Sequence, residues 1–390
     1  MNSSRRNFLA AGLTLPVAAS ASRVSTPGPA PAPAAASNLA PQDGGLRYRT
    51  LGKTGLKVTT VGFGCMITSD ASVIERAADM GINYFDTARG YQSGQNERMV
   101  GAAIKAKRKK LVLSTKSHGA NKQAALADLD ESLKQLGTDW VDIWYLHAKG
   151  KPDEITSELI EAQQEAKKAG KIRFAGVSTH SGQPEVIQAV IDNPKLDVVL
   201  VGYNFSMDQK VTDAITAASK AGKGVVAMKV MAGGFRRLKP GDKLQTTLKR
   251  EGAMVSALKW VVNNPNVHTT IPSMTDMDQL EENFKAMVSP FGEKDNQTLA
   301  QHLQYIGPMY CRMCGGCSGA CPKGVPVADV LRILTYADGY GQFPLARERY
   351  LELPKEVADV RCADCSTCAV ECRNGVMVAQ RLARAQEMFA

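Results

Sequence analysis

The sequence predicts an α/β fold, a (β/α)8 TIM barrel followed by a small, mainly helical domain. Apolar runs bounded by loops recur along the middle of the chain, and amphipathic helical patterns separate them. Strands and helices that alternate over about 240 residues match the size of one barrel. The eight predicted strands are Thr59–Cys65, Asn83–Ala88, Lys110–Lys116, Val141–Ala148, Arg173–Thr179, Asp197–Asn204, Gly224–Met231 and His268–Ser273.

The helical patterns between these strands end at clear stop signals. Lys122–Leu136 and Ile155–Ala169 are each followed by Gly, and Ala253–Asn263 is followed by Asn-Pro. A doubly wound sheet is the alternative arrangement. Its dinucleotide-binding version needs G-x-G-x-x-G after the first strand, and the first strand–helix unit lacks that motif. The barrel is therefore favoured.

The N-terminus predicts export. Arg5 and Arg6 precede a short apolar stretch, Phe8 to Ala21, and Ala19-Ser20-Ala21 is typical of a cleavage site. We expect a twin-arginine signal peptide at 1–21, a Pro/Ala-rich linker at 22–45 and a periplasmic or otherwise exported protein. A basic tail and an uncleaved anchor are the alternatives. We expect no transmembrane segment in the mature chain.

Two cysteine runs with the same C-x2-C-x2-C-x3-C spacing lie near the C-terminus. This spacing is typical of bacterial ferredoxins, whose thiolates hold [4Fe–4S] clusters. Structural zinc and a disulfide framework are the alternatives, but zinc usually takes paired C-x-x-C knuckles or a set containing His. The sequence therefore predicts a ferredoxin-like domain at 300–385 with two [4Fe–4S] clusters. The ligands are Cys311, Cys314, Cys317 and Cys321, then Cys362, Cys365, Cys368 and Cys372.

Charge and the remaining cysteine narrow the classes of function. The formal net charge is +10, and two all-cysteine clusters would lower it to about +6. Nucleic-acid binding is therefore not predicted, whereas an anionic substrate or an acidic redox partner is compatible with this charge. Cys65 alone lies outside the runs, which leaves an exported protein no disulfide to form. We expect Cys65 to be a small buried apolar residue, or else to line a cofactor site.

Polar side chains stand at the ends of three consecutive predicted strands. Asp86 and, five residues on, Tyr91 follow the second strand, Lys116 ends the third, and His147 ends the fourth. Each alone is more often structural, as a cap, a rim aromatic, a surface charge or a core histidine. In a barrel, however, the carboxyl ends of the strands meet at one face, where active sites lie. The four together predict an active site.

These residues lie in motifs that resemble the aldo-keto reductase family. The resemblance implies a barrel domain at 46–295 that reduces a carbonyl or oxidises an alcohol with NAD or NADP, and a sugar-like compound is one candidate substrate. The motifs are Phe85-Asp86-Thr87-Ala88 with Tyr91, Ser114-Thr115-Lys116, Tyr145-Leu146-His147, Gly176-Val177-Ser178, the hairpin Arg49 to Leu56, Gly62-Phe63-Gly64, and Ile271-Pro272 with Glu282-Asn283.

The resemblance implies a role for each of the four residues. Tyr91 is the general acid in reduction and the general base in oxidation, and Lys116 lowers its pKa. Asp86 orients Lys116, and His147 directs the substrate oxygen. The chemistry is consistent, because a tyrosine with a pKa near 10 is a poor acid at neutral pH unless an ammonium stands beside it.

The cofactor residues match the family less well. By resemblance, Ser178 contacts the carboxamide, Lys229 and Gly233 the pyrophosphate, and Glu282 and Asn283 the adenine side. A salt bridge at the barrel mouth is the alternative for Lys229. Thr179 stands where the family has Asn, Leu200 where it has Gln, and Met228 where it has an aromatic residue. Ser273 and Gln279 stand where the family has two cations that hold the 2′-phosphate. These departures favour NAD over NADP, or another cofactor in the barrel.

The segment between the cysteine runs predicts helices at Val327–Thr335 and Leu345–Tyr350, and it resembles helical two-cluster ferredoxin modules. If ligation crosses over as in ferredoxins, Cys372 joins the first three cysteines of the first run, and Cys321 joins the second. The sequence thus predicts an exported oxidoreductase that exchanges electrons with a redox protein or a quinone-linked partner. The alternative is an electron-transfer or partner-binding subunit whose barrel no longer turns over nicotinamide.

Overall fold

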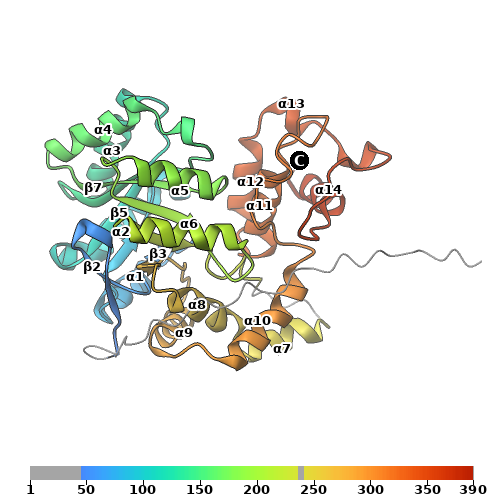
Figure 1. The fold of residues 1–390 in the computed structure, drawn as a ribbon, viewed down its shortest axis with the longest axis horizontal. Coiled ribbons are helices and arrows are strands. Elements are labelled where there is room, and N and C mark those ends of the chain that lie inside the picture. Colours follow the sequence, from blue (N-terminus) through green and yellow to red (C-terminus); the bar gives the residue numbers. More distant parts are fainter. Residues whose placement is uncertain (1–44, 236–240, 390) are drawn as a thin grey trace, which may run out of the picture.

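A computed structural model of the chain describes residues 45–235 and 241–389. Within them, parallel strands pair in chain order around a barrel (Figure 1). Bridges from Val61 to Thr270 and from Gly64 to Ser273 join the first and last strands and close it, as predicted. The strands are β3 (Phe63–Gly64), β4 (Tyr84–Asp86), β5 (Val112–Ser117), β6 (Val141–Leu146), β7 (Ile172–Thr179), β8 (Val198–Gly202), β9 (Gly224–Met228) and β10 (Thr269–Thr270).

Two glycines make the closure possible. Gly62 N donates to Thr270 O at 2.7 Å, and Gly64 N donates to Pro272 O at 3.0 Å. A Cβ at Gly64 would lie 2.5 Å from Ile271 O, and one at Gly62 would lie 2.9 Å from Tyr84 O. Any larger residue would push the first strand away from the last, which explains the Gly-Phe-Gly motif.

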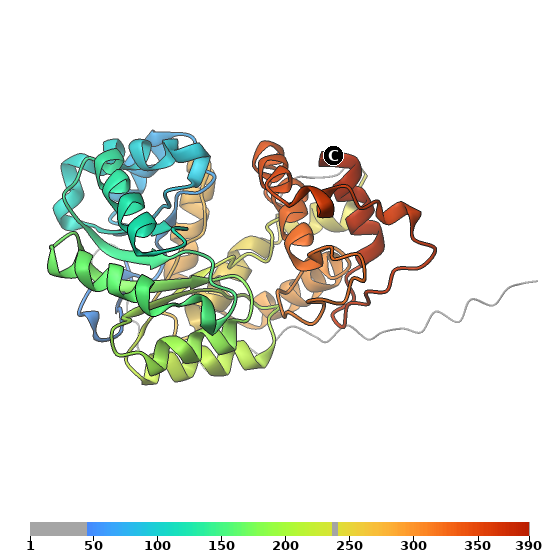
Figure 2. The ribbon, with the colours of Figure 1, turned by 90° about the horizontal axis from the view of Figure 1, so that it is seen from above.

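Helices cover the outside of the barrel, as Figure 2 shows from above. Two of them, α3 (Lys122–Leu136) and α8 (Ala253–Asn263), have the predicted bounds. Asn121 caps α3 by accepting from Ala124 N, and Gly137 ends it in the left-handed region. The others are α1 (Ala71–Asp79), α2 (Gln95–Ile104), α4 (Ser157–Lys168), α5 (Gln183–Asp192), α6 (Gln209–Lys220), α7 (Lys243–Arg250), α9 (Met277–Val288) and α10 (Glu293–Ile306).

Inside the barrel, large apolar side chains from alternate strands form a closed core. The predicted hairpin, β1 (Tyr48–Thr50) and β2 (Lys57–Thr59), seals its amino end, and Lys53 N donates to Gly222 O at 2.8 Å. The hairpin contributes Leu51, Leu56 and Val58 to the interior cluster, which also contains Tyr84, Ile143, Tyr145, Val198, Leu200 and Val226. The carboxyl end of the barrel is left for polar groups.

The C-terminal domain is mainly helical and has its own apolar core. Its helices are α11 (Val327–Asp338), α12 (Phe343–Leu351), α13 (Lys355–Ala358) and α14 (Val378–Phe389). The first two are longer than predicted. Pro344 lies in the first turn of α12, where its missing N–H would have no partner within the helix.

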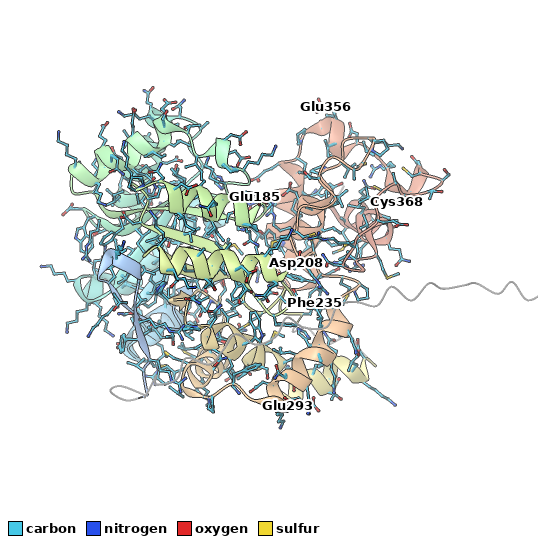
Figure 3. All side chains as sticks on the ribbon, in the orientation of Figure 1. Glu185, Asp208, Phe235, Glu293, Glu356 and Cys368 are labelled. Atoms are coloured by element: carbon cyan, nitrogen blue, oxygen red, sulfur yellow. The ribbon has the colours of Figure 1, made fainter. Side chains whose placement is uncertain are left out.

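The C-terminal domain lies beside the barrel and contacts loops at its carboxyl end (Figures 1 and 2). Arg373 pairs with Asp208, which Figure 3 labels on the side of the barrel that faces this domain. A Cβ on Gly339 would lie only 2.2 Å from Gly233 O, so two backbones meet closely here. The barrel-side core also includes Leu299, Leu303 and Ile306 of α10.

The predicted signal peptide, 1–21, and residues 22–44 of the predicted linker lie outside the described residues. Among the helices of the described ranges, none combines the length and the apolar character needed to cross a membrane. Cys65 is fully buried, in agreement with the sequence expectation.

Candidate active site

The structure brings Asp86, Lys116 and Tyr91 into direct contact at the carboxyl end of the barrel. Lys116 Nζ donates to Asp86 Oδ2 at 2.5 Å, to Thr87 O at 2.7 Å and to Tyr91 Oη at 3.3 Å. Ser114 Oγ donates to the other carboxylate oxygen of Asp86 at 2.7 Å. Asp86 and Lys116 are 1% and 2% exposed, so the ion pair is shielded from water and its geometry is fixed.

A strained turn presents Tyr91. Gln92 and Ser93, the next two residues, both have φ of 51°, in the left-handed region that non-glycine residues seldom adopt. Gln92 Nε2 holds this turn by donating to Met66 O at 3.2 Å and to Thr68 O at 2.7 Å. Such strain persists where the surroundings enforce it, and it is concentrated at functional sites.

Two buried polar residues of α2, which the sequence analysis missed, support the strand ends. Asn96 Nδ2 donates to Cys65 O at 2.8 Å, and its Oδ1 accepts from Thr87 Oγ1 at 2.6 Å. Glu97 accepts from Thr115 Oγ1 at 2.6 Å and pairs with Arg89. Both are fully buried at the start of an otherwise amphipathic helix, where the sequence pattern resembles an exposed first turn.

The electrostatics of the cluster favour a charged lysine and a neutral tyrosine. Burial disfavours the ammonium of Lys116, but the Asp86 carboxylate and then Tyr91 outweigh it and raise the pKa of Lys116. Burial also raises the pKa of Tyr91, and the Lys116 ammonium opposes this only in part. Lys116 thus lowers the pKa of Tyr91 as expected, but desolvation outweighs this effect and the net shift is upward. A protonated phenol is the form needed to give a proton to a carbonyl oxygen.

His147 lies next to Tyr91 and belongs to a group of three histidines. Its ring centroid is 6.0 Å from that of Tyr91, 4.0 Å from that of His118 and 6.3 Å from that of His180. Burial holds the pKa of His147 well below its usual value, and the neighbouring His118 and Lys116 lower it further. The Nδ1 atoms of His147 and His180 are buried without a partner. A neutral imidazole here can donate to or accept from a substrate oxygen.

The predicted cofactor residues divide into two groups. Ser178 is fully buried, and its Oγ accepts from Ala148 N at 2.9 Å, so it holds the loop after His147. Lys229 follows β9 with φ of 57°, and a Cβ on Gly233 would lie 3.0 Å from side-chain atoms of Tyr310 and Thr335. Gly233 therefore packs against the C-terminal part of the chain.

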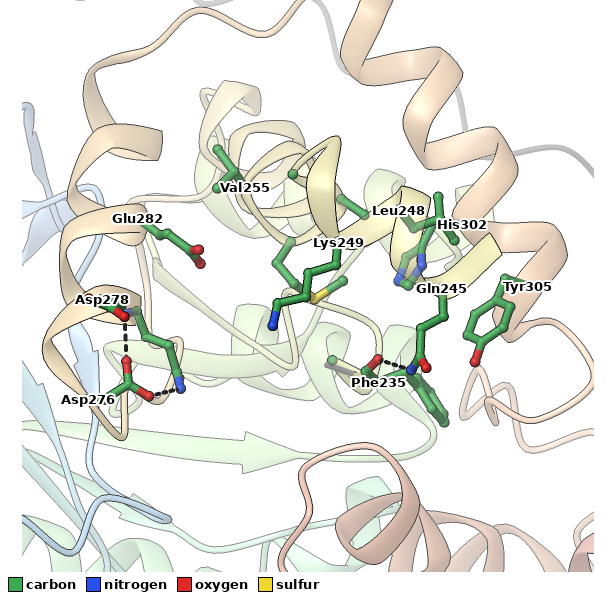
Figure 4. A pocket seen from close by; sticks show the side chains of 15 residues that line it. Phe235, Gln245, Leu248, Lys249, Val255, Asp276, Asp278, Glu282, His302 and Tyr305 are labelled. Atoms are coloured by element: carbon green, nitrogen blue, oxygen red, sulfur yellow. Dashed lines mark hydrogen bonds between the residues drawn. The ribbon is translucent and has the colours of Figure 1, made fainter. Parts of the chain in front are cut away.

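Glu282 and Asn283 lie elsewhere, on α9. A cavity of about 270 Å³ lies between α7, α8, α9 and α10, and Glu282 lines it (Figure 4). Figure 4 also shows Lys249, Gln245 and His302 around this space. Both side-chain nitrogens of His302 and both polar side-chain atoms of Asn283 are buried without a partner. Buried polar groups usually have a partner, and His302 also lines this cavity.

Cys311 and Cys362 each have electrostatic neighbours from both cysteine runs. The pKa of Cys311 is raised to about 12. Burial is the largest cause, and the thiols of Cys317, Cys314 and Cys372 also contribute to the rise. Burial likewise raises the pKa of Cys362, and the thiols of Cys365, Cys321 and Cys368 also contribute to this rise. We call Cys311, Cys314, Cys317 and Cys372 the proximal set, because Cys311 also packs against the barrel core, and Cys321, Cys362, Cys365 and Cys368 the distal set.

Breaking the buried ion pair is expected to destabilise the barrel. Lys116→Met removes the ammonium and leaves the Asp86 carboxylate buried without its counterion. We expect a loss of about 3–5 kcal/mol in the free energy of unfolding, measured by urea denaturation. The double variant Asp86→Asn/Lys116→Met removes both charges and is expected to recover part of this loss. Equal destabilisation in the two variants would mean that the carboxylate does not depend on Lys116.

Comparison with known proteins agrees with this geometry. The model of the aldo/keto reductase family matches residues 68–304. L-galactose dehydrogenase of Arabidopsis thaliana is 29% identical over 308 residues, which cover 68% of this chain and 95% of that protein. The solved holo structure of aldo-keto reductase AKR11C1 from Bacillus halodurans superposes with a TM-score of 0.57 at 26% identity, covering 69% of this chain and 98% of that one.

A second solved structure carries a bound cofactor. It is an aldo-keto reductase from Klebsiella pneumoniae in complex with NADPH, with a TM-score of 0.54 and 25% identity, covering 68% of this chain and 97% of that one. The family match spans more than half of the chain and contains the Asp86, Tyr91, Lys116 and His147 positions. The protein therefore belongs to the aldo/keto reductase family and is an oxidoreductase.

Proposed function

We propose that this protein is an exported oxidoreductase that reduces a carbonyl compound or oxidises the corresponding alcohol, with Tyr91 as the acid or base. One observation carries the proposal: Lys116 Nζ bridges Asp86 and Tyr91 Oη at the carboxyl end of the barrel. In reduction, the phenol gives a proton to the carbonyl oxygen, and Lys116 stabilises the phenolate that remains. His147 lies beside the phenol and orients the substrate oxygen.

A nicotinamide cofactor fits the residues of the barrel. Bound there, NAD or NADP would supply or accept a hydride at the substrate carbon. The cavity beside Glu282, which His302 also lines, suits the adenosine portion. Lys249 is an exposed cation on the cavity wall and could pair with a 2′-phosphate. The sequence analysis did not identify this residue. Affinities for NADH and NADPH, measured by fluorescence titration, distinguish the two.

Two [4Fe–4S] clusters fit the two sets of cysteines. Among the described residues, no group of three metal-binding side chains is arranged around a single ion. The proposal of clusters therefore rests on the ferredoxin-like spacing of the two cysteine runs. Bound clusters would pass single electrons between the barrel side and an external redox protein or quinone-linked donor.

The surroundings of the proximal set differ from those of the distal set. Asn374 Nδ2 lies 3.5 Å from Cys314 Sγ and is placed to donate to it. Arg312 and Arg373 also lie near this set, since Cys314 acts to raise the pKa of each guanidinium. Hydrogen bonds to sulfur and nearby positive charge stabilise the reduced, more negative cluster and raise its reduction potential.

Removing the Asn374 amide is therefore expected to affect one cluster only. In Asn374→Ala the reduction potential of the proximal cluster should fall by about 20–60 mV, the equivalent of one hydrogen bond in a one-electron couple. An EPR-monitored redox titration measures both clusters in one sample. Arg347→Gln, an exposed charge change in the same domain, is the control and should shift neither. Equal shifts of both clusters in Asn374→Ala would contradict the assignment of Asn374 to one set.

The activity is tested with holoprotein purified without oxygen. Oxidation of NADH and NADPH is followed with a panel of aldehydes and ketones, and the same panel is repeated with chemically reduced clusters as the electron source. Turnover in either assay supports the enzyme. Clusters that exchange electrons normally in a protein that never turns over a carbonyl would instead favour the electron-transfer subunit.

A further inference from the structure

Three polar side chains meet where the C-terminal domain contacts the barrel. Lys229 follows β9, and Arg332 and Tyr336 lie one turn apart on α11. Arg332 Nη1 donates to Tyr336 Oη at 2.9 Å, and Lys229 Nζ lies 5.6 Å from the centre of the Tyr336 ring. Tyr336 is 6% exposed. Two cations thus face one buried phenol.

The charges in this cluster are not balanced. Arg332 Nη2 donates to Asp329 Oδ1 at 3.0 Å, so its charge has a counterion. For Lys229, the described part of the chain supplies no carboxylate within ion-pair distance, in contrast to the barrel-mouth salt bridge that was one expectation for it. Burial lowers the pKa of Lys229, as expected of a cation that lacks a counterion.

The backbone of Lys229 is held in place. Lys229 has φ of 57°. Its carbonyl oxygen accepts from Asn204 Nδ2 at 3.0 Å and from Ala232 N at 3.1 Å. The same Asn204 amide donates to Tyr310 Oη at 3.1 Å, which links the strand end to the segment before the first cysteine run. A left-handed lysine secured from two sides is typical of a position kept for its side chain.

The cluster lies next to the catalytic residues. The rings of His147 and His180 are 6.3 Å apart, and after burial the charges of Lys229 and Arg332 contribute most to lowering the pKa of His180. Tyr336 is also among the groups that raise the pKa of Tyr91. The charges of Lys229 and Arg332 thus act on the group of histidines that stands beside Tyr91.

We propose that Lys229, Arg332 and Tyr336 form a subsite for the carboxylate group of the substrate, which would make the substrate an oxo acid or a related hydroxy acid. The inference rests on the proposed function and specifies its substrate class. The ammonium of Lys229 and the hydroxyl of Tyr336 supply the donors, and Arg332 holds that hydroxyl in place. Arg332 and Tyr336 lie beyond residues 68–304, so two of the three residues of the subsite lie outside the family match.

A diphosphate of the cofactor is the other source of an oxyanion near Lys229. The packing of the following loop argues against it. Gly233, which would offer an open backbone to a diphosphate, has Phe235, Tyr310 and Thr335 within 3.0 Å of the position a Cβ would occupy. Lys229, in contrast, lies over the Tyr336 ring, and its charge lowers the pKa of His180.

The subsite is expected to lose affinity at high pH. Burial raises the pKa of Tyr336, but Lys229 and Arg332 outweigh it and lower the pKa to about 8. Below that value the phenol is neutral and donates to a carboxylate, whereas above it the phenolate repels the carboxylate. The groups that face Tyr336 are Lys229 from the barrel, Arg332 and Tyr340 from α11, Arg349 from α12, and Tyr91 and Tyr310 from the loops.

The test compares two ketones that differ only at the end opposite the methyl group. Pyruvate carries a carboxylate where hydroxyacetone carries a hydroxymethyl group, and calorimetry on the anaerobic holoprotein measures the affinity of each. We expect pyruvate to bind about 10- to 100-fold more tightly, as charge-assisted hydrogen bonds predict. Equal affinities for the two ketones would overturn the proposal.

Variants separate this subsite from other causes. Lys229→Gln and Arg332→Gln should each weaken pyruvate binding about 10-fold or more and leave hydroxyacetone unchanged, whereas the control Arg347→Gln should change neither. Tyr336→Phe keeps the packing of its ring on Tyr340, 5.6 Å away, and should abolish the loss of pyruvate affinity above about pH 8. It therefore tests the proposal even if the charge variants fold poorly.

ADP-ribose, which carries the diphosphate without nicotinamide, is the third probe. If Lys229→Gln weakens ADP-ribose and leaves pyruvate unchanged, the cation serves the cofactor and the proposal is wrong. Failure of the proposed function would look different. In that case the wild type would reduce neither ketone, although the preference for pyruvate in binding would persist.

Discussion

Tyr91→Phe is expected to lower kcat/KM for carbonyl reduction by about 100- to 10,000-fold, the usual contribution of a general acid. The substitution removes only the phenolic oxygen, which lies 3.3 Å from Lys116 Nζ, and it keeps the ring against His147. Hydride delivery then lacks a proton at the substrate oxygen. Steady-state kinetics with an aldehyde or ketone substrate measure the loss.

The same variant also tests the electron-transfer alternative. Chemical reduction of the clusters should be unaffected in Tyr91→Phe, because the cysteine sets lie in the other domain. Ser93→Ala changes a side chain in the same strained turn and is the matched control, with expected rates near those of the wild type. A Tyr91→Phe protein that retains full activity would remove the tyrosine from the mechanism.

Cys372→Ala is expected to remove the proximal cluster and to leave the distal one in place. If each run held its own cluster, Cys372 would instead be a ligand of the same cluster as the other cysteines of the second run. The structure places it beside Cys311 and Cys317, whose pKa values it raises. We expect the iron content to fall by about half and one EPR species to disappear.

The identity of the lost cluster decides between the two patterns of ligation. In the crossed pattern, the distal cluster is the one that remains in Cys372→Ala. Adding Asn374→Ala to this variant should then leave the reduction potential of the remaining cluster unchanged. If the remaining cluster does respond, each run holds its own cluster and the two sets are wrongly assigned. Cys65→Ala is the control, because Cys65 is buried in the barrel and away from both runs. Its iron content should match that of the wild type.

The barrel and the cluster at its carboxyl end are predictable from the sequence because their signals are local. Apolar runs of strand length alternate with helical patterns, and parallel strands bring their carboxyl ends to one face. That is why Lys116, which lies 30 residues from Asp86 in the chain, meets Asp86 and Tyr91 as expected. The glycines at 62 and 64 also have a local reason, the close approach of β3 and β10.

Other parts of the site depend on contacts that no local pattern contains. Tyr336 and Arg332 lie on an amphipathic helix whose pattern predicts only a helix, and their position at the barrel mouth depends on how two domains pack. Asn96 and Glu97 are missed because a polar first turn usually faces solvent. The net pKa shift of Tyr91 depends on its burial, which the spacing of residues does not give.

The central claim is that one chain combines a nicotinamide-dependent barrel with two iron–sulfur clusters. The most direct test is to denature protein purified without oxygen and to measure iron, acid-labile sulfide and released nicotinamide together. We expect about eight irons and about eight sulfides per chain, with about one NAD or NADP. Zinc in place of iron, or iron without any bound or bindable nicotinamide, would contradict the claim.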